Sequence, residues 1–143
     1  MQIFTIGYEG VTQPELIASL EQAGVRRLVD VRALPLSRRP GFSKTVLSNG
    51  LKEAGIEYVS MKALGTPPDG RAAARRHDLE SLRRIYAEQL ALPEATVAGM
   101  QLRQMAQETP SAVLCYERDP TTCHRRLLVE AVLSDAEVVD LYP

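Results

Sequence analysis

Tryptophan is absent from this sequence of 143 residues, and phenylalanine and tyrosine together make up only 5% of it. A surface that stacks successive nucleic-acid bases needs aromatic side chains, so this scarcity argues against a base-stacking platform. The two cysteines are too few for the disulfide framework of a secreted protein. No apolar run approaches the about 20 residues that cross a bilayer, and the first residues lack a signal-peptide pattern. We therefore expect a cytoplasmic protein that has no membrane partner.

Strong net charge is also missing, because the formal charge at pH 7 is only −1. The sequence as a whole therefore has no general attraction for nucleic acid or for a membrane surface. Lysine is scarce, since Lys44, Lys52 and Lys62 are the only lysines among 17 basic residues. The other basic residues are arginines, whose planar guanidinium suits the recognition of phosphate and carboxylate groups. The base composition of the genome would also explain this preference for arginine over lysine.

The order of the expected elements indicates a single compact α/β domain over residues 1–143. Strands are expected at 2–6, 27–32, 56–60, 111–117 and 137–141. Helices are expected at 12–24, 43–55, 79–90, 93–109 and 123–133, from apolar residues at helical spacing and from capping and stop signals. Residues 64–70 are expected to form a loop before a basic cluster. Strands that alternate with helices predict a mostly parallel sheet of about four to five strands, flanked by helices.

The unit at 111–133 contains both cysteines and one of the two histidines, His124. Cys123 comes just before a predicted helix and beside arginines, a setting that lowers the pKa of a thiol and favours the thiolate. Cys115 ends the preceding strand and could equally be a small packed hydrophobic residue. Glu117 and His124 are the nearest candidates for a general base. The residue types indicate a reactive or ligand-binding site.

Arg125 and Arg126 lie in the predicted first turn of the helix that follows Cys123. Cations are disfavoured there, because a helix N-terminus already carries about half a positive charge. Free N–H groups together with two guanidiniums would suit an anion. Alternatively, both arginines extend into solvent and Asp119 offsets their charge.

Three segments with reactive or charged side chains follow the ends of predicted strands, at residues 8–9, 30–32 and 115–117. Ligands of parallel α/β sheets bind outside the carboxyl ends of the strands, so these segments are expected to converge there. The pair formed by Asp30 and Arg32 could instead be a structural ion pair. The candidate catalytic residues are Cys115, Glu117, Cys123, His124 and Asp30, and the candidate ligand-binding residues are Tyr8, Arg32, Ser37, Arg38 and Arg125.

Three motifs carry a resemblance to a known family. They are T-I-G-Y-E-G at 5–10, D-V-R-x-x-P-x-S-R at 30–38 and C-Y-E-R-D-P-T-T-C-H-R at 115–125. Together they resemble the DUF488 family of uncharacterised proteins, which implies a compact α/β domain and supplies no reaction. The signature residues of the resemblance are Tyr8, Asp30, Arg32, Pro35, Ser37, Arg38, Cys115, Glu117, Cys123, His124 and Arg125.

The outline is also similar to rhodanese-like domains, in which a later strand ends in a nucleophilic cysteine before a helix. Cys115 departs from that pattern, because Tyr116 and Glu117 follow it instead of a compact glycine-containing loop. A cysteine nucleophile remains one hypothesis, with Cys115 or Cys123 as the attacking thiol.

We therefore expect an enzyme or binding protein for a small anionic ligand, phosphorylated or nucleotide-like, in a cleft rich in cysteine and arginine. One alternative is a nucleotide or nucleic-acid binding module without catalysis, which the arginine clusters favour. Another is a metal site formed by Cys115, Glu117, Cys123 and His124, whose side-chain types suit zinc or iron. The spacing C-x7-C-H matches no standard structural zinc site, so no metal ligands are assigned. The cofactor, the reaction and the oligomeric state stay open.

Overall fold

The computed structural model describes all residues 1–143 and contains one five-stranded sheet. The strands are β1 (Gln2–Gly7), β2 (Arg27–Asp30), β3 (Glu57–Ser60), β4 (Ser111–Cys115) and β5 (Glu137–Leu141). Their order across the sheet is β3-β2-β4-β1-β5, and every neighbouring pair is parallel. The prediction of an α/β fold with a parallel sheet is confirmed. All carboxyl ends therefore lie along one edge.

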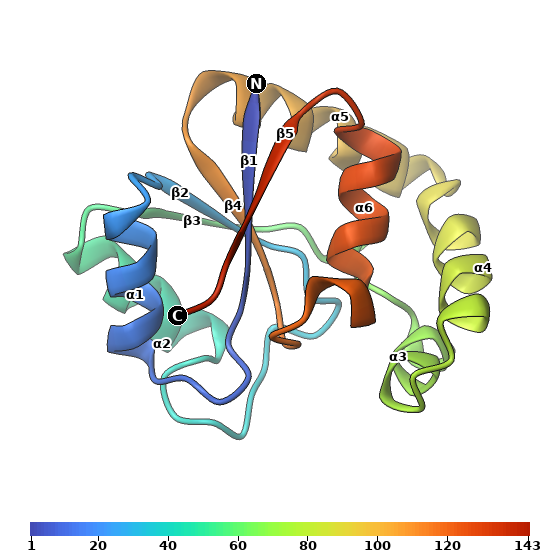
Figure 1. Cartoon of the computed structure of the whole chain (residues 1–143), viewed down its shortest axis with the longest axis horizontal. Coiled ribbons are helices and arrows are strands. Elements are labelled where there is room, and N and C mark those ends of the chain that lie inside the picture. The colour runs from blue at the N-terminus through green and yellow to red at the C-terminus, as the bar shows by residue number, and fades with distance from the viewer.

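Helices cover both faces of this sheet (Figure 1). The elements are α1 (Gln13–Gln22), α2 (Lys44–Glu53), α3 (Pro68–Arg75), α4 (Leu79–Leu90), α5 (Pro93–Glu108) and α6 (His124–Val132), with two short 3-10 turns at Lys62–Leu64 and Pro120–Thr122. Helices α1 and α2 lie on one side of the sheet, and α3 to α6 lie on the other (Figure 1). None of these helices is long and apolar enough to cross a bilayer.

Two apolar clusters, one on each face, form the core. Side chains of a strand alternate between faces, so Phe4 and Ile6 of β1 pack with α1 and α2 while Ile3 packs on the opposite side. Every residue of the central strand β4 is buried. The near-continuous apolar run at 111–115 is thus the pattern of a strand covered on both faces.

Local sequence signals explain how the first helices form. Thr12 and Glu15 make a capping box, in which each side chain accepts a hydrogen bond from the other residue's backbone N–H (3.3 and 2.9 Å). Helix α2 continues through Asn49 and Gly50, which are weak helix formers, because Leu47 and Leu51 are fully buried against the sheet.

The region after β3 differs from the sequence-based expectation. Residues 64–70 were expected to be a loop, but α3 begins at Pro68 and runs to Arg75. Proline is tolerated in the first turn of a helix, where its missing N–H would have no partner. Strands β2 and β4 also end two residues earlier than expected, at Asp30 and Cys115. Residues 31–32 and 116–117 are thereby free to turn over the carboxyl edge of the sheet.

Candidate functional site

A cavity of about 630 Å³ lies at the carboxyl ends of β1, β2 and β4. Its walls come from the segments that follow these strands, from α3 and from the start of α6. Glu9 joins two of the segments, because its backbone N–H donates to the carbonyl of Tyr116 (2.9 Å) and its carboxylate accepts from the N–H of Arg118 (2.9 Å). The predicted convergence of strand ends thus coincides with a cavity.

Arg32 enters the cavity with its guanidinium held from behind by Asp30. The two side chains make parallel hydrogen bonds, Nε to Oδ1 (2.9 Å) and Nη2 to Oδ2 (2.7 Å). Tyr8 accepts a further bond from Nη1 of Arg32 (3.3 Å), and Tyr58 donates its hydroxyl to Oδ2 of Asp30 (2.5 Å). Burial opposes the charge on Arg32, but the hydrogen bonds and charge of Asp30 outweigh it and raise the pKa of Arg32.

Cys115 and Cys123 meet at the floor of the cavity, with their Sγ atoms 2.7 Å apart. Cys115 is the last residue of β4, and Cys123 is the N-cap of α6, so two different elements position the thiols. The Sγ of Cys123 accepts a hydrogen bond from the backbone N–H of Arg125 (3.4 Å). Burial, followed by the neighbouring sulfur of Cys123, raises the pKa of Cys115 well above its usual value. Cys115 is therefore a protonated thiol when the site holds nothing else.

His124 is the first residue of α6 and is buried beneath the same cavity. One of its ring nitrogens, Nε2, lies 2.8 Å from the carbonyl oxygen of Val31. The ring also makes an edge contact with Tyr86 at 5.2 Å between centroids. Burial lowers the pKa of His124 to about 4, so the imidazole is neutral at physiological pH.

Arg125 is 1% exposed and lies behind the cavity wall. Its Nη2 donates to the carbonyls of Glu117 (2.8 Å) and Arg118 (3.4 Å), while Nε and Nη1 are buried without a hydrogen-bond partner. Burial opposes its charge, but the sulfurs of Cys115 and Cys123 raise the pKa of Arg125. Arg125 thus does not extend into solvent but is turned inward beside the thiols. Its predicted role in anion binding stays a prediction.

Glu117 lines the cavity beside the thiols, with an oxygen 3.7 Å from the Sγ of Cys115. Burial raises the pKa of Glu117, so its carboxyl holds a proton more readily than an exposed glutamate does. The side chains of Arg126 and Asp140 pair at 3.1 Å, outside this cavity. Of the two adjacent arginines, only Arg125 is buried beside this cavity, whereas Arg126 is paired with Asp140.

The structure adds a group of cavity residues from α3 that the sequence had not singled out. Arg71 donates from Nη1 to the carbonyl of Thr66 (2.8 Å), and Arg75 and His77 are exposed at the rim. The basic residues Arg71, Arg75, Arg76 and His77 were the available signal in the sequence, but a solvated helix start was the favoured explanation for them. Only the folding of α3 across the carboxyl edge brings these cations to the thiols.

Six of the sequence-predicted candidates line the cavity: Tyr8, Arg32, Cys115, Glu117, Cys123 and His124. Asp30 and Arg125 lie directly behind its wall and contact residues that line it. Ser37 and Arg38 do not line it. The hydroxyl of Ser37 accepts from the N–H of Arg39 (3.1 Å) within a turn, and Arg38 is exposed there.

The ligand atoms of Cys115, Cys123 and His124 all lie within 4.8 Å of one another. Sulfur and imidazole nitrogen are the ligands that zinc and related metals prefer in proteins. These residues are therefore the ones that could hold a metal ion.

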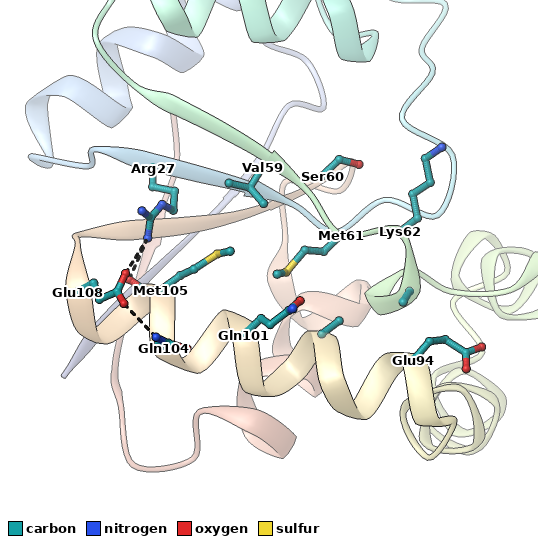
Figure 2. A pocket seen from close by; sticks show the side chains of 12 residues that line it. Arg27, Val59, Ser60, Met61, Lys62, Glu94, Gln101, Gln104, Met105 and Glu108 are labelled. Carbon is teal, nitrogen blue, oxygen red and sulfur yellow. Dashed lines mark hydrogen bonds and ion pairs between the residues drawn. The ribbon is translucent and has the colours of Figure 1, made fainter.

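A second cavity, of about 620 Å³, lies between the edge strand β3 and α5 (Figure 2). Figure 2 shows Arg27, Gln104 and Glu108 at one end of it. The carboxylate of Glu108 accepts from Nε2 of Gln104 (3.2 Å) and lies 4.0 Å from Nη1 of Arg27. At this end the polar groups pair with one another, and the cavity contains neither cysteine nor histidine. The cavity at the carboxyl edge is the candidate site.

These observations define a three-layer α/β domain that holds two contacting thiols, a neutral histidine and a buried arginine at the carboxyl edge of its sheet. The model of the DUF488 family, described as a domain of unknown function, matches residues 13–132. The chain belongs to this family, as its three motifs indicated. Searches of curated proteins and of solved structures gave no match.

Proposed function

We propose that this protein binds a small anionic molecule, phosphorylated or nucleotide-like, in the cavity at the carboxyl edge, with the thiols at the reacting end. The observation that carries the proposal is the meeting of three arginines, Arg32, Arg71 and Arg75, around a cavity whose floor holds Cys115 and Cys123. Guanidinium groups bind phosphate and carboxylate oxygens through paired N–H donors.

The three arginines would contribute differently. Asp30 already neutralises Arg32 and fixes the direction of its guanidinium, so Arg32 would orient a ligand. Arg75 is exposed, forms no ion pair and would supply the free positive charge. Arg71 is held by the carbonyl of Thr66 and would add a second charge. The anionic group is therefore expected at the α3 side of the cavity.

The apolar part of the lining supports a ligand with a hydrophobic or planar body. Leu34 and Leu36 line the cavity and yet are 57% and 72% exposed. Exposed apolar side chains that line a cavity favour a ligand with an apolar part, because the bound molecule covers them. The volume of about 630 Å³ lies in the range of small-molecule sites.

Calorimetric titration with inorganic phosphate and with adenosine monophosphate tests the proposal. Replacing Arg75 by alanine should weaken binding about tenfold to a hundredfold, since a charge-assisted hydrogen bond contributes about 1.5–3 kcal/mol. Arg76→Ala is the matched control, because Arg76 follows on the same helix end but pairs with Asp78 outside the cavity. Absence of binding by both probes, or equal affinities for the two variants, would contradict the proposal.

A further inference from the structure

We propose that Cys115, Cys123 and His124 bind a divalent thiophilic metal ion of the zinc class, through two sulfurs and one ring nitrogen. All three residues are buried, and their ligand atoms lie within 4.8 Å of one another. They come from the end of β4 and the start of α6, which the sheet edge holds in fixed positions.

An ion bound by both sulfurs would require the two Sγ atoms to move apart from their present separation. At 2.7 Å it is longer than the about 2.05 Å of a disulfide bond and shorter than an ordinary contact between unbonded heavy atoms. Two thiolates bound tetrahedrally to one zinc ion, at about 2.3 Å each, lie about 3.8 Å apart. Rotation of the Cys115 and Cys123 side chains that increases the distance between their Sγ atoms by about 1 Å makes room for the ion.

The hydrogen bond of His124 leaves one ring nitrogen free to bind a metal. The carbonyl oxygen of Val31 can only accept, so Nε2, at 2.8 Å, must carry the proton. The lone pair is then on Nδ1. Histidines that bind metals usually donate their other N–H to a carbonyl or carboxylate in this way, which fixes the tautomer and the ring direction.

Arg125 supplies an independent observation that points to negative charge at the thiols. It is 1% exposed, and its Nε and Nη1 have no partner. Buried donors without acceptors are costly, and so is a buried cation without an anion. Two metal-bound thiolates would provide both the acceptors and the charge. The cluster would carry no net charge, because the divalent ion and Arg125 balance two thiolates and the Glu117 carboxylate.

The cavity faces the fourth coordination position. Cys115, Cys123 and His124 all line it, so water or an anionic oxygen of a bound molecule would complete a tetrahedron. Three protein ligands and one open position distinguish catalytic from structural zinc sites. Binding releases the two thiol protons to the buffer and leaves the oxidation state of the ion unchanged. The inference uses the same cavity as the proposed function but does not depend on it.

Titration with cobalt(II) alone tests the site. The full chain is reduced and stripped of metal with a chelator under anaerobic conditions, and cobalt is then added. The expected result is one ion per chain, with a sulfur-to-cobalt charge-transfer band and the intense visible bands of tetrahedral cobalt. Zinc should remove these bands by displacing cobalt, in line with the order of metal affinities.

Three variants assign the ligands. Cys115→Ser and Cys123→Ser should each weaken cobalt binding at least about a hundredfold and reduce the charge-transfer band, and His124→Gln should weaken it about tenfold or more. His77→Gln is the matched control, because His77 lies at the rim of the same cavity but outside the cluster. The His77→Gln variant should bind cobalt with the same affinity as the wild type. If a variant fails to fold, the spectrum of the wild type alone decides.

The inference is overturned if the reduced protein gives no sulfur-to-cobalt band, or if Cys115→Ser retains the wild-type spectrum and affinity. A bond between Cys115 and Cys123 that withstands the reduction, detected as a mass lower by two hydrogens, also overturns it. No anionic ligand is present in the titration. Phosphate binding without a cobalt band therefore contradicts the metal site only, and a cobalt band without phosphate binding contradicts the proposed function only.

Discussion

Arg32 and Asp30 form a buried, two-point ion pair at the end of β2, with Nε–Oδ1 and Nη2–Oδ2 distances of 2.9 and 2.7 Å. The Asp30 side chain is fully buried and that of Arg32 is 7% exposed. The pair is thus a structural support of the cavity as well as part of its wall. An Arg32→Ala variant would consequently lose more than an anion contact.

Removal of one partner from this pair should be strongly destabilising. In Arg32→Met the Asp30 carboxylate stays buried with Tyr58 as its remaining side-chain donor, and we expect a loss of about 3–5 kcal/mol in the free energy of unfolding. Urea unfolding measures it. Arg83→Met is the control, since the Arg83–Glu130 pair is 3.9 Å long and exposed, and should cost no more than about 1 kcal/mol. Equal losses in the two variants would contradict a structural role for Arg32.

The double variant Asp30→Asn/Arg32→Met refines this prediction. Removing the charge of residue 30 as well takes away the buried, uncompensated carboxylate, so the double variant should be more stable than Arg32→Met alone. If the double variant loses as much free energy of unfolding as the two single variants together, the two side chains do not interact.

A methyl group at Gly7 should displace the segment after β4 and the Arg125 side chain, which lie against this glycine. A Cβ built at Gly7 lies 1.9 Å from the carbonyl oxygen of Glu117 and 2.9 Å from Nη1 of Arg125. Since the obstructing atom belongs to the backbone, Gly7→Ala should cost at least about 3 kcal/mol in urea unfolding. Gly24→Ala is the comparison, because Gly24 has open space around it and only a left-handed φ of 77°, which costs about 1–2 kcal/mol. Similar losses at both positions would refute the close approach at Gly7.

The pair of Arg103 and Asp135 predicts a small dependence of stability on pH. Hydrogen bonds from Arg103, 2.6 Å to each oxygen, lower the pKa of Asp135 to about 2 from an ordinary value of 3.8. A pKa that is lower in the folded state contributes stability above about pH 4, and this contribution disappears as the pH falls toward about 2. The wild type should therefore be more stable than Asp135→Asn at neutral pH and equal to it near pH 2.

Solvent screening keeps this effect small, because the side chains of Arg103 and Asp135 are 37% and 58% exposed. Urea unfolding at a series of pH values checks it. Glu88→Gln, which removes an exposed carboxylate that forms no ion pair, should show no such difference. An advantage of the wild type that grows toward pH 2 would give the opposite sign and disprove the assignment.

The thiols should react slowly with iodoacetamide in the folded, metal-free protein. Cys115 and Cys123 are each 2% exposed, so alkylation should be at least about a hundredfold slower than after unfolding in urea. Mass spectrometry of the labelled peptides follows each cysteine separately. The reactive Cys123 thiolate that the sequence suggested stays a prediction, and fast labelling of Cys123 alone in the folded protein would support it. Zinc added before the reagent should slow both thiols further if they bind it.

The regular elements of this fold were predictable because their signals are local. The capping box of Thr12 and Glu15, the apolar run that became β4 and the spacing of Leu79, Leu82 and Tyr86 each depend on neighbouring residues. Residues 64–75 were harder to assign, because prolines and glycine in the first turn of α3 resemble a loop when only their propensities are considered.

The candidate site was predicted in part for a different reason. Parallel strands place all their carboxyl ends at one edge, so the sequence alone predicts that Tyr8, Arg32 and Cys115 meet. The sequence could not assign Arg71 and Arg75 to this site, since no local pattern says where α3 packs. Nor could it show that Ser37 and Arg38 would lie outside the cavity wall.

By itself, then, the sequence of this protein determined a parallel α/β domain and the group of strand ends at which its unusual residues gather. Periodicity, caps and turns act over a few residues, and they are present in the chain before it folds. Only the tertiary structure decided that Cys115 and Cys123 touch, that Val31 selects the tautomer of His124 and that Arg125 points inward. These contacts are made between residues of different elements. They form only when the strand order and the helix packing bring those elements together.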